Sequence, residues 1–90
     1  MKETTVEDYL VKVAAEHGYR AEKIDVRGKR YRPDRVLTHP WRPAIYVETK
    51  APGRRPSPGQ VREHKRLRLM GYRVYVIDSK EGVNQLAEAL

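Results

Sequence analysis

The chain has 90 residues, no cysteine and a formal net charge of +7, with a sequence pI near 9.9. This length allows one small domain, expected to span residues 1–90, and the lack of cysteine excludes disulfides and thiolate metal sites. No apolar run approaches the roughly 20 residues of a membrane span and no signal-peptide core is present, so we expect no membrane contact and a cytoplasmic protein.

The first segment of the chain predicts a helix. Thr4 or Thr5 can cap its N-terminus, and Gly18 is a typical C-terminal stop. Glu7 lies at the edge of the apolar stripe, where it can complement the helix dipole or contribute to a site. The apolar residues of this stripe recur at helical spacing, at Val6, Leu10, Val13 and Ala14.

Two strands are expected next, over residues 19–26 and 31–37. Pro33 lies inside the second run, which indicates a strand start, an edge position or a bulge, because proline cannot donate to the ladder. Asp34 follows this proline directly. The kink would aim its carboxylate away from the regular ladder.

The loop at 38–43 holds Trp41, for which packing on the sheet, a dimer contact and stacking on a nucleic-acid base are all open. A strand over 45–50 follows, rich in β-branched and aromatic residues. Because side chains alternate along a strand, Glu48 and Lys50 share one face, and the odd-numbered residues face a core. Charges at the end of a buried strand are costly unless they are paired or bind an ion. They therefore mark either a solvated strand end or a site.

The second helix has a clear start. Ser57 is the expected N-cap, Pro58 the first helical residue and Gln60 the partner in a capping box. Gln60 and His64 share one helix face, where His64 is expected at the edge of the core. The helix should end at Gly71.

A strand over 72–77 and a short C-terminal helix capped by Asp78 or Ser79 complete the chain. Because a helix separates the strands at 45–50 and 72–77, we expect these two strands to be parallel. The predicted order is αβββαβα. It indicates an α/β fold with a mixed sheet flanked by helices.

The basic charge is concentrated after the 45–50 strand. Residues 50–73 contain eight basic residues and one acidic residue, Glu63, so this stretch accounts for the whole excess of +7. A solvated helix face is the alternative reading, but the near-absence of compensating acids favours nucleic acid. The candidate phosphate contacts are Arg54, Arg55, Arg62, Lys65, Arg66 and Arg68.

The charged residues of the two neighbouring strands suggest metal chemistry. Asp34 and Glu48 can together hold Mg²⁺, which prefers hard oxygen ligands and keeps several waters. The backbone carbonyl of Thr49 can supply a third oxygen. Lys50 shares a face with Glu48, so it can orient or deprotonate an attacking water. Gln60 has two readings, a helix cap and a part of the site.

In this order the residues resemble the PD-(D/E)xK nuclease motif and, more closely, its virus-type replication-repair nuclease (VRR-NUC) branch. The resemblance covers residues 6–79. It implies a restriction-endonuclease-like α/β core and metal-dependent phosphodiester hydrolysis. The matching pieces are Glu7, Pro33-Asp34-Arg35, Val47-Glu48-Thr49-Lys50-Ala51-Pro52-Gly53, Gln60, Leu67 and Gly71-Tyr72-Arg73-Val74.

The resemblance also implies a role for each matching position. Asp34 and Glu48 would be the metal ligands, with Glu7 as a further acidic contributor. Lys50 would be the catalytic lysine, and Gln60 the helix glutamine that supports the site. Stand-alone members of the branch are similar to small phage proteins that dimerise and cut branched DNA.

The sequence therefore predicts a structure-selective DNA endonuclease that depends on Mg²⁺ or Mn²⁺ and cuts branched DNA such as four-way (Holliday) junctions in recombination or repair. A homodimer is expected, in the cytoplasm of a bacterial or phage-infected host cell. The alternatives are a non-catalytic DNA-binding accessory protein of the same fold, and a nuclease acting on flaps or single strands.

Overall fold

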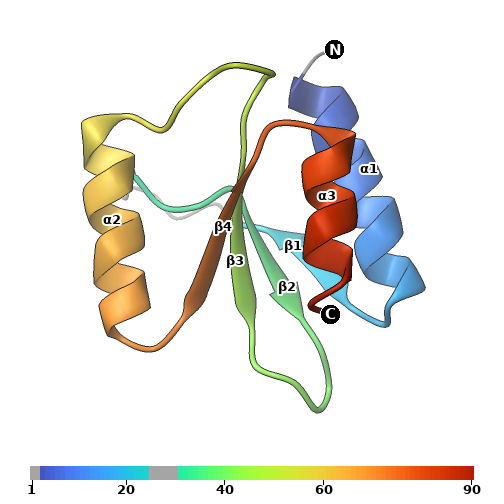
Figure 1. The fold of residues 1–90 in the computed structure, drawn as a ribbon. Coiled ribbons are helices and arrows are strands. Elements are labelled where there is room, and N and C mark those ends of the chain that lie inside the picture. Colours follow the sequence, from blue (N-terminus) through green and yellow to red (C-terminus); the bar gives the residue numbers. More distant parts are fainter. Residues whose placement is uncertain (1–2, 25–30) are drawn as a thin grey trace.

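The computed structural model describes residues 3–24 and 31–90, and the side chains from Thr5 onward in these ranges. Their elements follow the predicted order αβββαβα (Figure 1), which is confirmed. In chain order they are α1 (Glu3–Glu16), β1 (Arg20–Lys23), β2 (Arg35–Thr38), β3 (Ile45–Thr49), α2 (Pro58–Leu69), β4 (Arg73–Ile77) and α3 (Lys80–Ala87).

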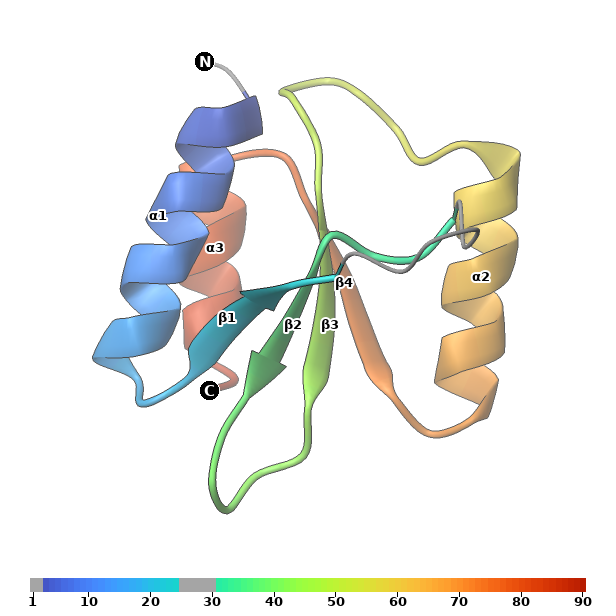
Figure 2. The same cartoon turned by 180° about the vertical axis from the view of Figure 1, so that it is seen from behind.

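The strands form one mixed sheet in the order β1-β2-β3-β4. The pairs β1–β2 and β2–β3 are antiparallel, whereas β3 and β4 are parallel, as predicted from the helix that connects them. Helices α1 and α3 lie on one face of the sheet, and α2 lies on the other (Figures 1 and 2). Both faces of β3 are thus covered.

The hydrophobic core fills the space between the sheet and helices α1 and α3. Ile45 and Val47 point into it from β3, as their odd positions predict. They meet apolar side chains of the two helices, including Leu10 and Val83. The opposite face of β3 carries Glu48, which is also buried, because α2 covers that face.

The predicted start of the first helix is wrong. Helix α1 begins at Glu3, so Thr4 and Thr5 lie inside its first turn and neither is the N-cap. Threonine is tolerated there because the first amide groups of a helix have no intrahelical partner to lose. Strand β1 ends at Lys23, and the last part of the predicted 19–26 strand lies outside the described residues.

The second strand also starts later than predicted, at Arg35 and not at residue 31. Pro33 explains the difference, because it has no N–H group to donate to a ladder. Asp34 lies between this proline and β2, and its backbone carbonyl accepts a hydrogen bond from Ile24 N at 2.9 Å. Pro33 thus lies two residues before the strand, outside it, and the predicted strand start is the option nearest to this position.

The second helix begins as predicted. Ser57 is the N-cap, and its capping box with Gln60 is reciprocal: each side chain accepts a hydrogen bond from the other residue's backbone N–H. Gly71 follows the helix with a φ of 94°, a conformation that glycine adopts without strain. Ser79 caps α3. Within the described residues, none of the helices has the length and apolar character needed to cross a membrane.

Candidate active site

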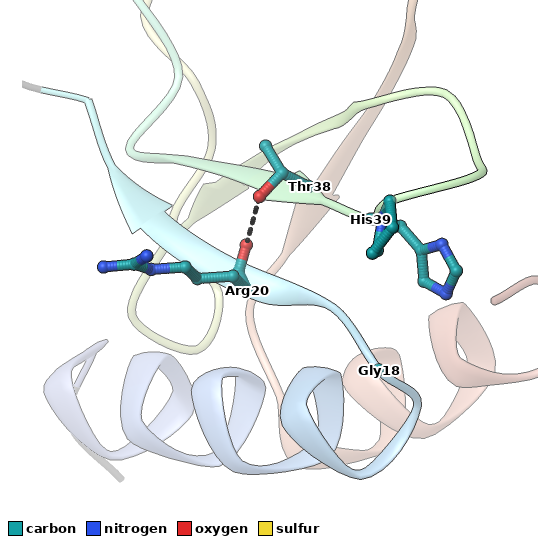
Figure 3. A pocket seen from close by; sticks show the side chains of 5 residues that line it. Gly18, Arg20, Thr38 and His39 are labelled. Carbon is teal, nitrogen blue, oxygen red and sulfur yellow. Dashed lines mark hydrogen bonds between the residues drawn. The ribbon is translucent and has the colours of Figure 1, made fainter.

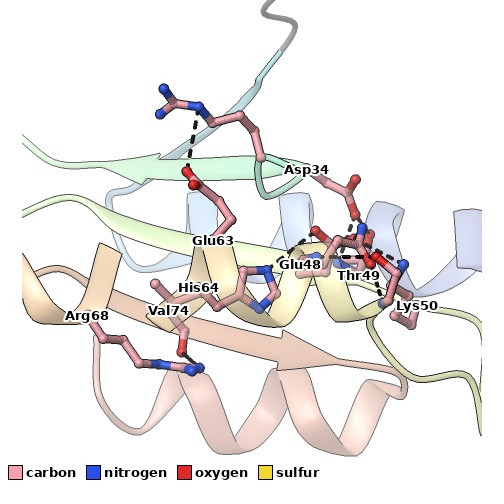
Figure 4. A network of polar contacts seen from close by, with 11 residues as sticks. Asp34, Glu48, Thr49, Lys50, Glu63, His64, Arg68 and Val74 are labelled. Atoms are coloured by element: carbon pink, nitrogen blue, oxygen red, sulfur yellow. Dashed lines mark hydrogen bonds and ion pairs between the residues drawn. The ribbon is translucent and has the colours of Figure 1, made fainter. Parts of the chain in front are cut away.

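The candidate site lies where β2 begins and β3 ends. Because these strands are antiparallel, the start of one lies beside the end of the other. Asp34, just before β2, is therefore brought next to Glu48, Thr49 and Lys50 (Figure 4). The predicted cluster of these residues is present in the fold.

Thr49 holds the carboxylate of Asp34. Its backbone N–H donates a hydrogen bond to Asp34 Oδ2 at 2.9 Å, and its hydroxyl donates to the same oxygen at 3.0 Å. Thr49 itself is fully buried. Two donors from one buried residue fix the direction of the Asp34 side chain.

Glu48 is contacted by several side chains. Its Oε2 accepts a hydrogen bond from Gln60 Nε2 at 3.2 Å and lies 3.4 Å from Lys50 Nζ. Its Oε1 lies 3.9 Å from His64 Nε2 and accepts no hydrogen bond from the described residues. The Glu48 side chain is 2% exposed and that of Lys50 is 20% exposed, so the pair is largely shielded from water.

This environment shifts the acidity of Glu48. Burial, followed by the charge of Asp34, raises its pKa from 4.5 to about 7, against the opposing effect of Lys50. At neutral pH the Glu48 carboxyl is thus divided between its protonated and ionised forms. Burial also lowers the pKa of His64, helped by the charge of Arg68, so His64 is neutral at this pH.

The donor set fits a hard divalent cation. Two carboxylates repel one another at this point, and one buried oxygen of Glu48 lacks a hydrogen-bond donor. A cation would stabilise the ionised form of both acids. Within the described residues, no group of three or more acidic or histidine side chains is placed to hold a metal. Two carboxylates suffice for Mg²⁺, which fills its remaining positions with water and substrate oxygens.

Glu7 takes part in a different contact. Its Oε1 accepts a hydrogen bond from Arg35 Nε at 2.9 Å and lies 2.9 Å from Arg35 Nη2 in an ion pair. Arg35 also donates to the backbone carbonyl of Ala21, so this ion pair joins α1, β1 and β2. Glu7 is not among the side chains that contact Glu48. Its predicted metal role, like that of the Thr49 carbonyl, stays a prediction.

Comparison with known proteins shows the family to which this fold belongs. No family model matches the chain. It is 41% identical over 81 residues to "Putative nuclease p44" of Acyrthosiphon pisum secondary endosymbiont phage 1, across 90% of this chain and 87% of that protein. A solved structure described as "VRR_NUC domain" superposes with a TM-score of 0.90 at 31% identity, over 98% of this chain and 96% of the other. The chain belongs to the VRR-NUC family. The predicted family and fold class are confirmed, and the protein is a nuclease of the VRR-NUC type.

The six predicted phosphate contacts of this VRR-NUC nuclease fall into two groups. Arg54 and Arg55 are exposed in the loop after Gly53, whose N–H donates to Asp78 Oδ2 at 3.2 Å. The other four are exposed on α2, where two of them already have protein partners: Arg66 pairs with Glu63, and Arg68 donates to a backbone carbonyl of β4. The four are Arg62, Lys65, Arg66 and Arg68.

His64 is the site residue that sequence reasoning placed differently. It was expected at the edge of the core, but its side chain is 2% exposed and faces Glu48. The signal in the sequence is its spacing, because His64 follows Gln60 by one helical turn and so projects toward the same carboxylate.

Trp41 lies at the opposite end of the sheet from this VRR-NUC site. It is 87% exposed, so packing on the sheet, one of its three readings, is wrong. Its ring contacts that of His39 at 5.6 Å between centroids. His39 also lines a hollow of about 440 Å³. Figure 3 shows this hollow beside the start of β1 and the end of β2. The remaining lining residues are Gly18, Arg20, Thr38 and Pro40.

Proposed function

We propose that this VRR-NUC nuclease is a divalent-metal-dependent endonuclease that hydrolyses phosphodiester bonds of branched DNA, such as four-way junctions. The observation that supports it most is the position of Lys50 Nζ, 3.4 Å from the buried carboxylate of Glu48 and beside Asp34. A metal-binding pair of acids and an amine at one strand end are the groups that phosphodiester hydrolysis needs.

The proposed metal is Mg²⁺ or Mn²⁺, held by Asp34 and Glu48, with the Thr49 carbonyl as a further oxygen donor and Glu7, which is paired with Arg35, as a weaker one. When bound, such an ion stabilises the charge that develops on the phosphate and lowers the pKa of a bound water. Thr49 keeps Asp34 directed at the ion through its two hydrogen bonds.

The proposed role of Lys50 is to orient the attacking water. Its ammonium group is held close to Glu48 and is mostly shielded from solvent, which limits the positions that it can take. Gln60 donates to the same oxygen of Glu48, so it keeps the carboxylate in one plane. Lys50 and Gln60 would thus act by orienting the attacking water and the Glu48 carboxylate.

The exposed basic residues are the proposed DNA contacts. Lysine and arginine side chains neutralise phosphates without reading sequence, so a substrate would be selected by its shape. The residues are Arg54, Arg55, Arg62, Lys65, Arg66 and Arg68.

A homodimer is part of the proposal, because a two-fold axis would place two sites on two strands of a junction. Leu69 is 79% exposed at the end of α2, and Met70 beside it is also exposed, so apolar surface is available for a second copy. Light scattering tests this, and a monomer mass would contradict it. The phage origin of the p44 relative supports action in the cytoplasm of an infected host, in recombination or repair.

The test is cleavage of a labelled four-way junction, a flap, a duplex and a single strand, each without metal, with Mg²⁺ and with Mn²⁺. Lys50→Ala and Glu48→Ala should bind the junction and not cut it. Lys12→Ala, an exposed change on α1 across the sheet, should cut like the wild type. Wild-type binding without metal-dependent cutting would favour a non-catalytic accessory protein. Preferred cutting of flaps or single strands would contradict the branched substrate.

A further inference from the structure

Two buried polar atoms, one on Glu48 and one on His64 of α2, face each other at the inner side of the site. Glu48 Oε1 and His64 Nε2 lie 3.9 Å apart, and neither forms a hydrogen bond within the described part of the chain. Both side chains are 2% exposed. Figure 4 shows the His64 ring directed at the Glu48 carboxylate. Buried polar atoms without a partner are rare because each costs free energy, so such a pair calls for an explanation.

The distance limits what can lie between the two atoms. It exceeds the 3.2 Å or so of a good hydrogen bond, and it is shorter than the roughly 4.5 Å that a bridging water with two such bonds requires. A small rotation of the Glu48 carboxylate would close the gap, because the terminal torsion of glutamate is broad. A direct contact is therefore the nearest arrangement that satisfies both atoms.

Whether this contact is attractive or repulsive depends on the tautomer of the His64 imidazole. A neutral histidine carries its proton on either Nδ1 or Nε2. With Nε2 unprotonated and Glu48 ionised, as a metal ligand must be, two lone pairs would face each other at this distance. With the proton on Nε2, the ring donates toward Oε1 while Gln60 donates to Oε2 from one helical turn earlier. The two oxygens of one carboxylate would then be held from one helix.

We propose that His64 is a positioning residue of this nuclease, whose Nε2–H tautomer fixes the carboxylate plane of Glu48 together with Gln60. The inference rests on the proposed function in one respect, which is that Glu48 binds the metal. With Oε1 of Glu48 held by His64, Oε2 stays turned toward Lys50, where it lies 3.4 Å from Nζ. Partners that orient a metal ligand in this way commonly change metal affinity or activity by about 10–100-fold when they are removed.

A matched pair of variants separates this role from packing. Glutamine can place its amide N–H close to the position of histidine Nε2, whereas methionine has a similar length and no donor. We therefore compare His64→Gln with His64→Met. Asparagine keeps an amide but reaches only to about the position of Nδ1, so His64→Asn is a second donor control. His64→Leu replaces His64→Met if the latter does not fold.

The first measurement is Mg²⁺ and Mn²⁺ binding to the DNA-free protein by calorimetry. We expect His64→Met and His64→Asn to weaken metal binding by about 10–100-fold, and His64→Gln to recover most of that loss. For DNA cleavage, kcat should fall in the same order while KM for the junction changes little. Equal metal affinity for His64→Gln and His64→Met would overturn the proposal, whether both match the wild type or both fall equally.

The second measurement is the tautomer of His64 in the metal-free protein at pH 8, where Glu48 is mostly ionised, by long-range ¹⁵N NMR. Protonated Nε2 is the expected state, and protonated Nδ1 would overturn the proposal. Neither this spectrum nor the calorimetry requires cleavage. If the wild-type protein cuts no DNA, the proposed function is wrong, but these two measurements still decide the role of His64.

Discussion

The amide of Gln60 joins the start of α2 to the carboxylate of Glu48. Its Oε1 accepts a hydrogen bond from Ser57 N at 2.9 Å, and its Nε2 donates to Glu48 Oε2 at 3.2 Å. The capping box and the site were two competing readings of this residue in the sequence. They are compatible because an amide has an acceptor end and a donor end, each used once.

Ser57→Ala and Gln60→Ala should separate these two contacts. Each removes part of the capping box, so each should lower the free energy of unfolding by about 1 kcal/mol, measured in urea. Only Gln60→Ala also removes the hydrogen bond to Glu48, and we expect it to lower kcat by about tenfold or more. Equal kcat values for the two variants would show that the bond to Glu48 has no role in catalysis.

The raised pKa of Glu48 predicts how stability depends on pH in EDTA. The unfolded chain releases this proton near pH 4.5, and the folded protein retains it until about pH 7. The folded state therefore binds more protons between these values, and stability falls across this range as pH rises, by at most about 3 kcal/mol. Glu48→Gln removes this loss, so it should be more stable than the wild type at pH 8. Urea unfolding of both proteins at pH 5 and pH 8 checks it, and parallel curves would contradict it.

Divalent metal should stabilise the folded protein most at high pH. Above pH 7 Glu48 is ionised beside Asp34, so Mg²⁺ or Mn²⁺ offsets a repulsion that is weaker at pH 5. At one hundred times the Kd of the metal, the expected gain is about 2.7 kcal/mol, visible as a higher Tm. Asp34→Asn should lose this gain. Glu16→Gln, an exposed change on α1, should keep it, and a loss in that control would indicate non-specific binding.

Glu7→Gln should affect stability more than metal affinity. Its carboxylate is already neutralised by Arg35, with two contacts of 2.9 Å, and this ion pair joins α1 to β2. We expect a fall of about 1 kcal/mol or more in the free energy of unfolding, as for a hydrogen bond between charged groups. The metal Kd should change less than in Asp34→Asn. An equal loss of metal affinity in both variants would instead make Glu7 as important for metal binding as Asp34.

The basic loop after β3 should control the salt dependence of DNA binding. Arg54→Ala and Arg55→Ala should each lower the slope of log K against log salt by about 0.9, the value for one phosphate contact on duplex DNA. Arg20→Ala is the matched control, because this exposed arginine lies on β1 and pairs with Glu22. A similar change in Arg20→Ala would show that total charge, and not this loop, governs binding.

Much of the fold could be predicted because its signals are local. Ser57 and Gln60 mark a helix start within four residues, and the helix between β3 and β4 accounts for their parallel pairing. The order of Asp34, Glu48 and Lys50 along neighbouring strands was likewise sufficient to predict their convergence. The antiparallel pairing of β2 with β3 brings these three residues close together in space.

The wrong predictions concern weak local signals. Thr4 and Thr5 both resemble caps, but α1 begins before them, because helix ends depend on more than one candidate residue. For Trp41, packing on the sheet was one of three open readings, and it is wrong because the side chain is exposed; burial depends on which surface lies opposite.

The sequence by itself determined the family, the order of the elements and the acid, amine and amide groups of the site. Only the tertiary structure decided which of these groups touch. The pairing of Glu7 with Arg35, and the approach of His64 to Glu48, depend on how α1 and α2 pack on opposite faces of the sheet. Helical spacing predicts the direction in which a side chain projects. Which residue it contacts depends on how the helix packs against the sheet.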